Sequence, residues 1–345
     1  MSLYQEIREQ PACLRRLLDG QLGRAEEIAR AIRARRPRFV YLAARGTSDN
    51  AGRYAQYVLG WHHALPVALA TPSLFSLFGR PPDLADALVI GISQSGQSPD
   101  IVRVVEHGAS QGALTLAITN SPDSPLAAAA DHVFETGAGP ELAVAATKTY
   151  TSQLFAVALL SAALADAGAH RADLARVPAA MESALGREDA VRRVAERFRA
   201  MDRCVVLGRG FHFATAHEWA LKLKELGHVA AEPYSPADFQ HGPIAVLERG
   251  FPVLAVASRG AAFDDTMALL RRIGARQDVE LLVVSDADEA LALGGAALPF
   301  DAGLPEWLTP IAAIVPAQLF CLHLARAKGL DEESPPGLTK VTRTW

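Results

Sequence analysis

Apolar runs alternate with helix-like segments along most of this chain. Residues 39–59 begin with an apolar run, pass through a glycine-containing turn and continue with a helical spacing of apolar positions. The apolar run at 88–92 is followed by a polar loop and a second helical pattern. Continuous apolar strands that alternate with helices are typical of parallel sheets whose two faces are both covered by helices. The pattern therefore predicts an α/β fold.

The same succession of elements occurs twice. Residues 203–225 repeat the pattern of residues 39–59. Further landmarks keep an offset of 164 or 165 residues, namely the pairs Gly46 and Gly210, Ser93 and Ser258, and Gln153 and Gln318. Chance similarity would not keep one offset through several elements. The fold class that we expect is α/β, with two tandem doubly wound parallel-sheet domains of the flavodoxin-like, three-layer type.

The repeat divides the chain into four expected segments. These are a helical segment at 1–35, a first domain at 36–170, a second domain at 171–330 and a C-terminal tail at 331–345. We expect a linker near residues 168–177, and a helix at about 179–200 that leads into the second copy. Each domain is long enough to bury a core of its own.

The composition is that of a folded protein with no general attraction to polyanions. Half of the residues are hydrophobic and 21% are charged, which is far from the composition of disordered chains. The 34 Lys and Arg residues against 38 Asp and Glu residues give a net charge of −4, which argues against a nucleic acid partner and against an anionic membrane surface. Three widely spaced cysteines fit neither a disulfide framework nor a metal site, and indicate a reducing compartment.

The sequence shows no targeting or membrane segment. Charges are spread through residues 1–20, which lack the apolar core of a signal peptide. No run approaches the roughly 20 apolar residues that cross a bilayer. We therefore expect a cytoplasmic protein without a membrane partner.

A loop of the first copy carries hydroxyl groups at the edge where open parallel sheets bind ligands. Ser93, Ser95 and Ser98 surround Gly96 in this loop, and a helix is expected to begin at Pro99. The free N–H groups and the dipole of a helix N-terminus favour a phosphate group, and small hydroxyls add neutral donors. The loop therefore predicts a phosphate cradle.

A second turn supports this interpretation. Thr47 and Ser48 follow Gly46 after the first strand, at the same sheet edge. The chain has neither the GxxxxGK[ST] loop of triphosphate sites nor the GxGxxG loop of dinucleotide sites, so we expect a phosphomonoester. The alternative is that these hydroxyls only cap helices. The second copy has Ala257–Ala262 instead of the serine loop, so we expect one phosphate site, in the first domain.

The second copy carries titratable groups that the first copy lacks. Glu218, Lys222 and Glu225 share one face of an expected helix, and their spacing alone favours a solvent-exposed ladder of ion pairs. His241 lies in an expected turn, and an unperturbed histidine pKa near 6.5 suits proton transfer. Lys340, by position alone, belongs to a frayed C-terminal tail.

Six segments occur in the order and spacing of the sugar isomerase (SIS) domain family. They are ARGTSDNAGRYAQY, GISQSGQSPD, ELAVAATKTYTSQL, ALKLKE, QHGP and LTKVT. The chain resembles the tandem SIS proteins along nearly its whole length, both the isomerase half of glutamine:fructose-6-phosphate amidotransferase and the stand-alone type II glucosamine-6-phosphate deaminases. The resemblance implies two SIS domains that act on a sugar phosphate, and we expect no metal and no cofactor.

The resemblance also implies which residues bind the substrate. It places the phosphate on a set of side chains from the two hydroxyl-bearing turns, namely Thr47, Ser48, Ser93, Gln94, Ser95 and Ser98. It further implies that backbone groups of Val144 and Ala145 contact the sugar hydroxyls.

Four further residues acquire catalytic roles from the resemblance. Glu225 would move a proton between C1 and C2 of the open-chain sugar, and Lys222 would assist that transfer. His241 would open the pyranose ring, and in the synthase this histidine comes from the neighbouring subunit, which implies a homodimer with shared active sites. Lys340 would form a Schiff base with the C2 carbonyl of the ketose, or lie against it.

The expected reaction is a deamination. The synthase carries an N-terminal glutaminase domain with a cysteine nucleophile, and these 345 residues hold none. We therefore expect a metal-independent enzyme that converts glucosamine 6-phosphate and water to fructose 6-phosphate and ammonia. The alternatives are a fructosamine-phosphate deglycase, a synthase-type isomerase lacking glutaminase and, from another class, a non-catalytic sugar-phosphate sensor. The presence of Glu225, His241 and Lys340 favours an enzyme over a sensor.

Overall fold

Two compact units make up the chain in the computed structural model, which describes residues 2–165, 168–275, 279–301, 303–340 and 342. The unit called here the first-repeat unit comprises residues 12–141, 148–175 and 339–345. The second-repeat unit comprises residues 1–11, 142–147 and 176–338. Residues 341 and 343–345 of the expected tail lie outside the described residues.

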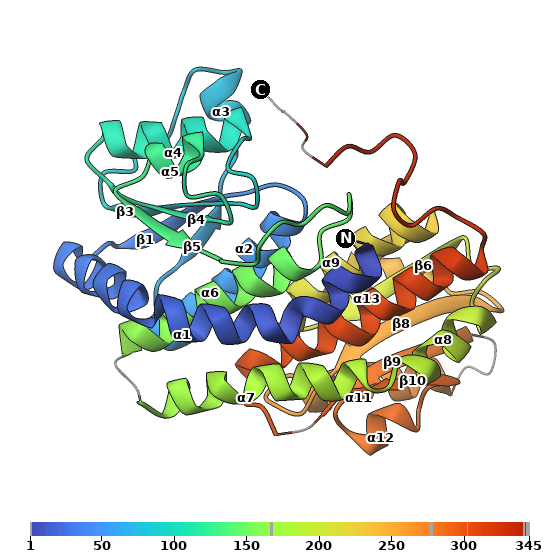
Figure 1. The fold of residues 1–345 in the computed structure, drawn as a ribbon. Helices are drawn as coiled ribbons and strands as arrows, with labels where there is room; N and C mark the ends of the chain where they lie inside the picture. The colour runs from blue at the N-terminus through green and yellow to red at the C-terminus, as the bar shows by residue number, and fades with distance from the viewer. Residues whose placement is uncertain (1, 166–167, 276–278, 302, 341, 343–345) are drawn as a thin grey trace. The chain divides into compact units, whose positions relative to one another are not determined.

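The first-repeat unit is built on a parallel sheet with the strand order β2-β1-β3-β4-β5. Figure 1 labels β1, β3, β4 and β5 of this sheet. Its strands are β1 (Phe39–Ala43), β2 (Val67–Leu69), β3 (Ala87–Ser93), β4 (Leu114–Thr119) and β5 (His132–Glu135). Every residue of β3, the central strand, is buried. This burial agrees with the continuous apolar run from which the strand was predicted.

Helices cover both faces of this sheet. They are α1 (Leu3–Arg35), α2 (Thr47–His63), α3 (Ser73–Ser76), α4 (Pro99–Ser110), α5 (Pro125–Ala128) and α6 (Lys148–Ala165). Apolar side chains of α3, α4 and α5 form one core cluster with Tyr41 and Val89 of the sheet. The side chain of Leu42 points to the face of the sheet opposite to that cluster. Gly52 of α2 lies against Leu42, and α6 packs beside α2 on that second face.

The second-repeat unit contains a parallel sheet with the same topology, in the order β10-β9-β8-β6-β7. Its strands are β6 (Arg203–Gly208), β7 (Ala230–Tyr234), β8 (Phe251–Ala257), β9 (Val279–Ser285) and β10 (Ala296–Pro299). The helices of this part of the chain are α7 (Gly168–Leu185), α8 (Glu188–Arg197), α9 (His212–Gly227), α10 (Pro236–Gln240), η1 (Pro243–Val246), α11 (Phe263–Gly274), α12 (Asp288–Leu291), η2 (Glu306–Leu308) and α13 (Thr309–Ala327). Residues of α10, α11 and α12 share a core cluster with one face of the sheet, and α13 packs along α9, with the Trp219 and Phe320 rings 5.9 Å apart.

The two sheets confirm the predicted α/β class and the internal repeat. The elements β6, β8 and α11 begin 164 residues after β1, β3 and α4, respectively. One pairing from the sequence analysis is wrong by a residue. Ser93, the last residue of β3, corresponds to Ala257 at the end of β8, and Ser258 corresponds to Gln94.

The prediction of a linker near residues 168–177 is wrong. These residues begin α7, and the expected helix at about 179–200 consists of the end of α7 followed by α8. Leu174, Val177 and Met181 are completely buried at helical spacing along α7. The apolar stripe that they form stabilises a helix where composition alone suggested a connection.

The segment Glu306–Ala327 departs from the expectation that no run is long enough for a membrane span. By length and composition it could cross a bilayer, with a mean hydropathy of 1.7. The apolar window of this segment is, however, 100% buried inside the protein. It is the central helix of a core, where apolar residues on all sides are expected.

Candidate functional site

The two hydroxyl-bearing turns meet at one edge of the first sheet. β1 and β3 are parallel neighbours, so the turns that follow them lie side by side at the carboxyl edge. Gly46, with φ of +53°, makes the turn after β1, and α2 begins at the next residue. The structure thus brings together all six predicted phosphate ligands, which are Thr47, Ser48, Ser93, Gln94, Ser95 and Ser98.

Neutral groups hold the loop after β3 in shape. The Ser93 hydroxyl accepts a hydrogen bond from the Gly96 N–H at 3.1 Å, and the Ser95 hydroxyl accepts one from the Gln97 N–H at 3.3 Å. Ser98 is the N-cap residue of α4, yet within the described part of the chain its side chain makes no capping hydrogen bond. The contacts of this loop therefore do not support the alternative interpretation, in which its serines serve only as helix caps.

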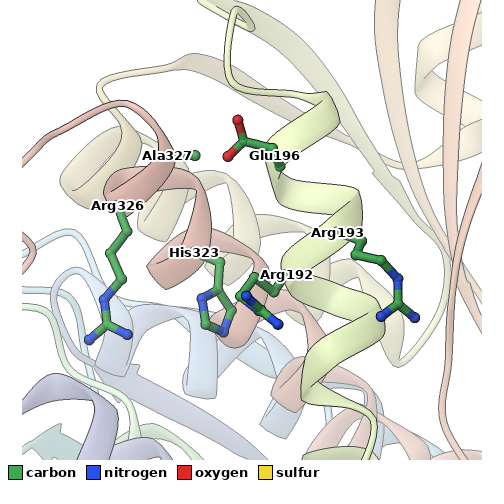
Figure 2. Close-up of a pocket in the computed structure, with 6 residues that line it drawn as sticks. All are labelled: Arg192, Arg193, Glu196, His323, Arg326 and Ala327. Carbon is green, nitrogen blue, oxygen red and sulfur yellow. The ribbon is translucent and has the colours of Figure 1, made fainter.

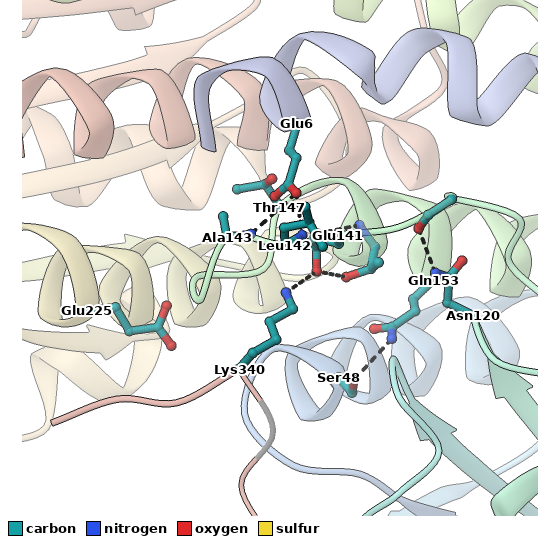
Figure 3. A network of polar contacts seen from close by, with 12 residues as sticks. Glu6, Ser48, Asn120, Glu141, Leu142, Ala143, Thr147, Gln153, Glu225 and Lys340 are labelled. Carbon is teal, nitrogen blue, oxygen red and sulfur yellow. Dashed lines mark hydrogen bonds and ion pairs between the residues drawn. The ribbon is translucent and has the colours of Figure 1, made fainter. Parts of the chain in front are cut away.

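Ser48 is tied to the core behind this edge. Its hydroxyl accepts a hydrogen bond from the buried Gln153 amide of α6, with 3.0 Å between the two atoms (Figure 3). Ser48 and Ser93 are each only 8% exposed. Because their partners fix both hydroxyls, they form a rigid base for the two turns.

A cation flanks the same turns. Arg45, directly before Gly46, is half-exposed and pairs with the buried carboxylate of Asp100 on α4 at 2.8 Å. Asp49, in the first turn of α2, lies 3.0 Å from Arg53. Burial raises the pKa of Asp49, and the neighbouring Arg53 opposes this shift. The charges at this edge are therefore paired and held in fixed positions.

A buried carboxylate fixes the segment that contains Val144 and Ala145. Glu6 of α1 is completely buried, and its Oε1 accepts hydrogen bonds from the backbone N–H groups of Leu142 at 2.5 Å and of Ala143 at 3.3 Å (Figure 3). This segment clusters with the second-repeat unit, whereas the hydroxyl-bearing turns belong to the first-repeat unit. We did not identify Glu6 as a functional residue from sequence, because its role depends on a segment 136 residues away.

The acid–base residues of α9 form a buried cluster. The Lys222 ammonium lies 3.5 Å from the Glu218 carboxylate and also hydrogen-bonds the Glu225 carboxylate. The side chains of Lys222 and Glu218 are 1% and 0% exposed, whereas that of Glu225 is 20% exposed. The solvent-exposed ladder that the spacing favoured is therefore wrong.

The packing of α13 against α9 explains why Lys222 and Glu218 are buried rather than exposed. α13 runs along α9, and Cys321 of α13 lies close enough to Lys222 and Glu218 for their charges to act on its thiol. Burial raises the pKa of this thiol well above its usual value. Glu218 was not among the predicted catalytic residues, although its position one turn before Lys222 on the same face was visible in the sequence.

Lys340 is not part of a frayed tail. Its ammonium pairs with the buried Glu141 carboxylate at 2.8 Å (Figure 3). Glu141 also accepts hydrogen bonds from the N–H group of Thr149 at 3.1 Å and from its hydroxyl at 2.8 Å. The sequence analysis missed Glu141, although it opens the quoted segment ELAVAATKTYTSQL.

His241 lies apart from the α9 cluster. It is exposed at the end of α10, where its N–H donates to the Asp238 carbonyl at 3.0 Å. No hydrogen bond among the described residues joins its imidazole to Lys222 or Glu225. The structure therefore places this predicted catalytic residue on the surface of the second-repeat unit.

A separate pocket of about 500 Å³ opens between α8 and α13 (Figure 2). None of the predicted site residues lines it; its lining residues are Arg192, Arg193, Glu196, His323, Arg326 and Ala327. Burial lowers the pKa of His323, against the opposing effect of Glu188 at 3.2 Å. In the described part of the chain, no group of three or more His, Cys, Asp or Glu side chains is arranged to hold a metal ion.

Comparisons with known proteins identify the family of this chain. The model of the SIS domain family matches residues 35–163 and 198–325. Glutamine–fructose-6-phosphate aminotransferase (isomerizing) of Gloeobacter violaceus is 34% identical over 358 residues, which cover 98% of this chain. The chain spans only 58% of the length of that relative.

Solved structures of related proteins share the fold of this chain. The C-terminal domain of glucosamine-fructose-6-phosphate aminotransferase from Francisella tularensis matches with a TM-score of 0.87 and 28% identity, over 96% of this chain and 98% of that domain. Glucosamine-6-phosphate deaminase of Thermotoga maritima covers 100% of both chains with a TM-score of 0.78, and at 19% identity it supports the fold alone. The resemblance inferred from sequence is thus confirmed, and the chain belongs to the SIS domain family, with one SIS copy in each repeat.

Proposed function

We propose that this protein is a metal-independent amino-sugar phosphate isomerase that releases ammonia from glucosamine 6-phosphate and forms fructose 6-phosphate. The observation that carries the proposal is the α9 cluster, in which a buried ammonium lies between a buried carboxylate and the partly exposed carboxylate of Glu225. A carboxylate held beside a cation, with one side open to solvent, suits the transfer of a proton to and from a substrate.

The phosphate of the substrate binds at the carboxyl edge of the first sheet in this proposal. Hydroxyl and amide groups of Ser48, Ser93, Gln94, Ser95 and Ser98 surround the phosphate, together with Thr47. The N-termini of α2 and α4 contribute backbone N–H groups and the positive ends of their dipoles. Val144 and Ala145 offer backbone groups to the sugar hydroxyls, and Glu6 keeps their segment in position.

The chemistry is a proton transfer followed by a hydrolysis. Glu225 removes the C2 proton of the open-chain amino aldehyde while O1 takes up a proton, which gives an enol that carries the amino group on C2. Glu225 then returns its proton to C1 as the nitrogen gives up one proton, which leaves an imine at C2. Water adds to C2, the C–N bond breaks, and ammonia leaves with the proton that it needs, so that fructose 6-phosphate remains. Lys222 hydrogen-bonds Glu225 and keeps its carboxyl group in position for both transfers.

Lys340 lies against C2 in this proposal, or forms a Schiff base with the C2 carbonyl of the ketose. Glu141 supports this role because it anchors the Lys340 ammonium from a buried position. An amine nucleophile must lose a proton before it attacks a carbonyl, and a hydrogen-bonded carboxylate can accept that proton. The residue therefore has both an anchor and a proton acceptor.

His241 opens the pyranose ring, and we propose that it acts in a homodimer with shared active sites. Its exposure at the end of α10 suits a residue that serves a neighbouring copy. An imidazole can both donate and accept a proton, as the opening of the ring requires.

The proposal is tested by ammonia release from glucosamine 6-phosphate, measured without added metal and in the presence of a chelator. Glu225→Gln should abolish turnover and leave the binding of fructose 6-phosphate within about threefold of wild type, because the variant keeps the shape of the side chain and loses its basicity. Glu232→Gln, on an exposed part of β7, is a matched control. Unchanged turnover in Glu225→Gln would reject Glu225 as the base.

A second candidate is the reverse reaction, amination of fructose 6-phosphate. It is favoured by the relative from Gloeobacter violaceus, which is named as an aminotransferase. The same preparation supplied with fructose 6-phosphate and ammonium should then form glucosamine 6-phosphate. Release of ammonia from a fructosamine phosphate alone would favour a deglycase, and tight binding without any turnover would favour a sugar-phosphate sensor.

A further inference from the structure

The second repeat keeps the backbone of the phosphate cradle but not its side chains. Along the 164-residue offset, all six residues proposed to bind phosphate in the first repeat are replaced. Phe211 and His212 stand in place of Thr47 and Ser48. Ala257, Ser258, Arg259 and Ala262 stand in place of Ser93, Gln94, Ser95 and Ser98, respectively. Gly260 is retained at the position of Gly96, and α11 begins where α4 begins in the first repeat. A loop that leads into a helix N-terminus is thus present in both copies.

Carboxylates occupy the backbone donors of the second-repeat loop. The Ala261 N–H donates to Oε2 of Glu306 at 2.8 Å, and the Ala262 N–H donates to its Oε1 at 3.4 Å. The Arg259 N–H donates to the Asp286 carboxylate at 2.9 Å. In the first repeat the corresponding loop is held by the hydroxyls of its own serines instead.

Glu306 lies in close contact with the loop. A Cβ atom at Gly260 would stand only 2.1 Å from the Glu306 carboxyl carbon, and the φ of Gly260 is +150°. Glycine is therefore required here both by the backbone conformation and by the approach of the carboxylate. Two oxygens bound to successive N–H groups at a helix N-terminus form the arrangement by which helices bind phosphate oxygens.

The remaining side of the loop is closed by a polar network in the core. His212, the counterpart of Ser48, places its Nε2 2.6 Å from the Ser258 hydroxyl and 3.0 Å from the Thr309 hydroxyl. Thr309 in turn donates to the Glu306 carbonyl at 2.7 Å. Burial lowers the pKa of His212 to about 3, so this imidazole is neutral and offers no cation to a ligand. The network fixes Glu306 through the first turn of α13.

We propose that the Glu306 carboxylate is a built-in substitute for phosphate, which closes the second-repeat loop to ligands and leaves each chain with one sugar-phosphate site. The number of one site per chain rests on the proposed function, because that site is the phosphate site proposed for the first repeat. It goes beyond that function because it assigns a role to a residue that touches no substrate. Removing the carboxylate should open an anion site at the loop 258–262.

The test compares Glu306→Ala with Glu289→Ala, with inorganic phosphate as the probe. Glu289 lies 3.5 Å from the Arg259 guanidinium, so its removal deletes the same charge beside the same loop without freeing the loop N–H groups. Equilibrium dialysis should give about one bound phosphate per chain for wild type and Glu289→Ala, and about two for Glu306→Ala. Equal stoichiometry in both variants would overturn the proposal.

The same measurement separates this proposal from the proposed function. If wild type and Glu289→Ala bind no phosphate while Glu306→Ala binds about one, the role of Glu306 stands and the first-repeat site fails. The melting temperature supplies a second readout in sodium phosphate and in sodium chloride of the same ionic strength. Phosphate should raise it more in Glu306→Ala than in wild type, because phosphate replaces the lost carboxylate.

A measurement on wild type covers the case in which Glu306→Ala does not fold. The amide proton resonances of Ala261 and Ala262 should shift together in an acid titration, since both N–H groups donate to the Glu306 carboxylate. The Gln97 amide in the first repeat, which donates to a serine hydroxyl, is the internal control and should not follow that titration. Absence of a common shift would overturn the assignment.

Discussion

Replacement of Lys222 by methionine should destabilise the protein strongly. The substitution keeps the apolar stem of the side chain and deletes the ammonium, which is 1% exposed and lies 3.5 Å from the completely buried Glu218 carboxylate. Removing one partner of a buried ion pair costs about 3–5 kcal/mol of unfolding free energy, because the remaining charge is left without compensation. An exposed pair such as Arg199 and Glu196 contributes only about 0–1 kcal/mol, so Arg199→Met is the control.

The assay is urea unfolding, followed by circular dichroism at pH 7.5. The double variant Glu218→Gln/Lys222→Met removes both charges and should recover most of the loss, because a neutral amide is far less costly to bury than a carboxylate. In the single variant, stability should increase as the pH falls. A buried, unpaired carboxyl has a raised pKa in the folded state, so protonation favours folding. If Lys222→Met costs less than about 1 kcal/mol, like the control, the α9 cluster is hydrated and the reasoning fails.

Three further predictions follow from named contacts. Burial lowers the pKa of His212 in the folded state to about 3. The stability that its neutral form contributes is therefore complete above the ordinary pKa of 6.5, and it decreases as the pH falls towards 3, by at most about 1.4 kcal/mol per pH unit. The unfolding free energy of His212→Asn, measured against pH, should decrease less steeply than that of wild type. Glu6→Gln should cost about 1.5–3 kcal/mol in the same assay, since it weakens charged hydrogen bonds to Leu142 and Ala143. Equal mixtures of inactive Glu225→Gln and His241→Asn proteins, reassociated from subunits, should regain about a quarter of wild-type turnover if active sites are shared, and none if they are not.

The alternation of apolar runs and helical patterns determined the fold class of this protein. Strand and helix types depend mainly on the spacing of apolar residues, which is a local property. The 164-residue repeat then located equivalent turns in the two copies. The hydroxyl-bearing turns were predictable for the same reason, since the carboxyl ends of neighbouring parallel strands share one sheet edge.

The linker and the ion pairs of α9 were not predictable in this way. The residues near 168–177 form a helix because Leu174 and Val177 are buried, and burial depends on which elements lie against them. Sequence spacing placed Glu218, Lys222 and Glu225 on one face of a helix. It could not show that α13 packs along that helix and removes Glu218 and Lys222 from water.

The long-range partners of the site were decided by tertiary structure alone. Lys340 meets Glu141 across 199 residues of sequence, and Glu306 meets the loop at Ala261 across 45 residues. Glu141 binds the Lys340 ammonium together with the Thr149 N–H group, whereas Glu306 binds the N–H groups of Ala261 and Ala262. The sequence by itself determined which residues share a strand, a turn or a helix face. Packing between distant elements decided which of them are desolvated and which charges meet, because the dielectric environment of a side chain depends on its neighbours in space.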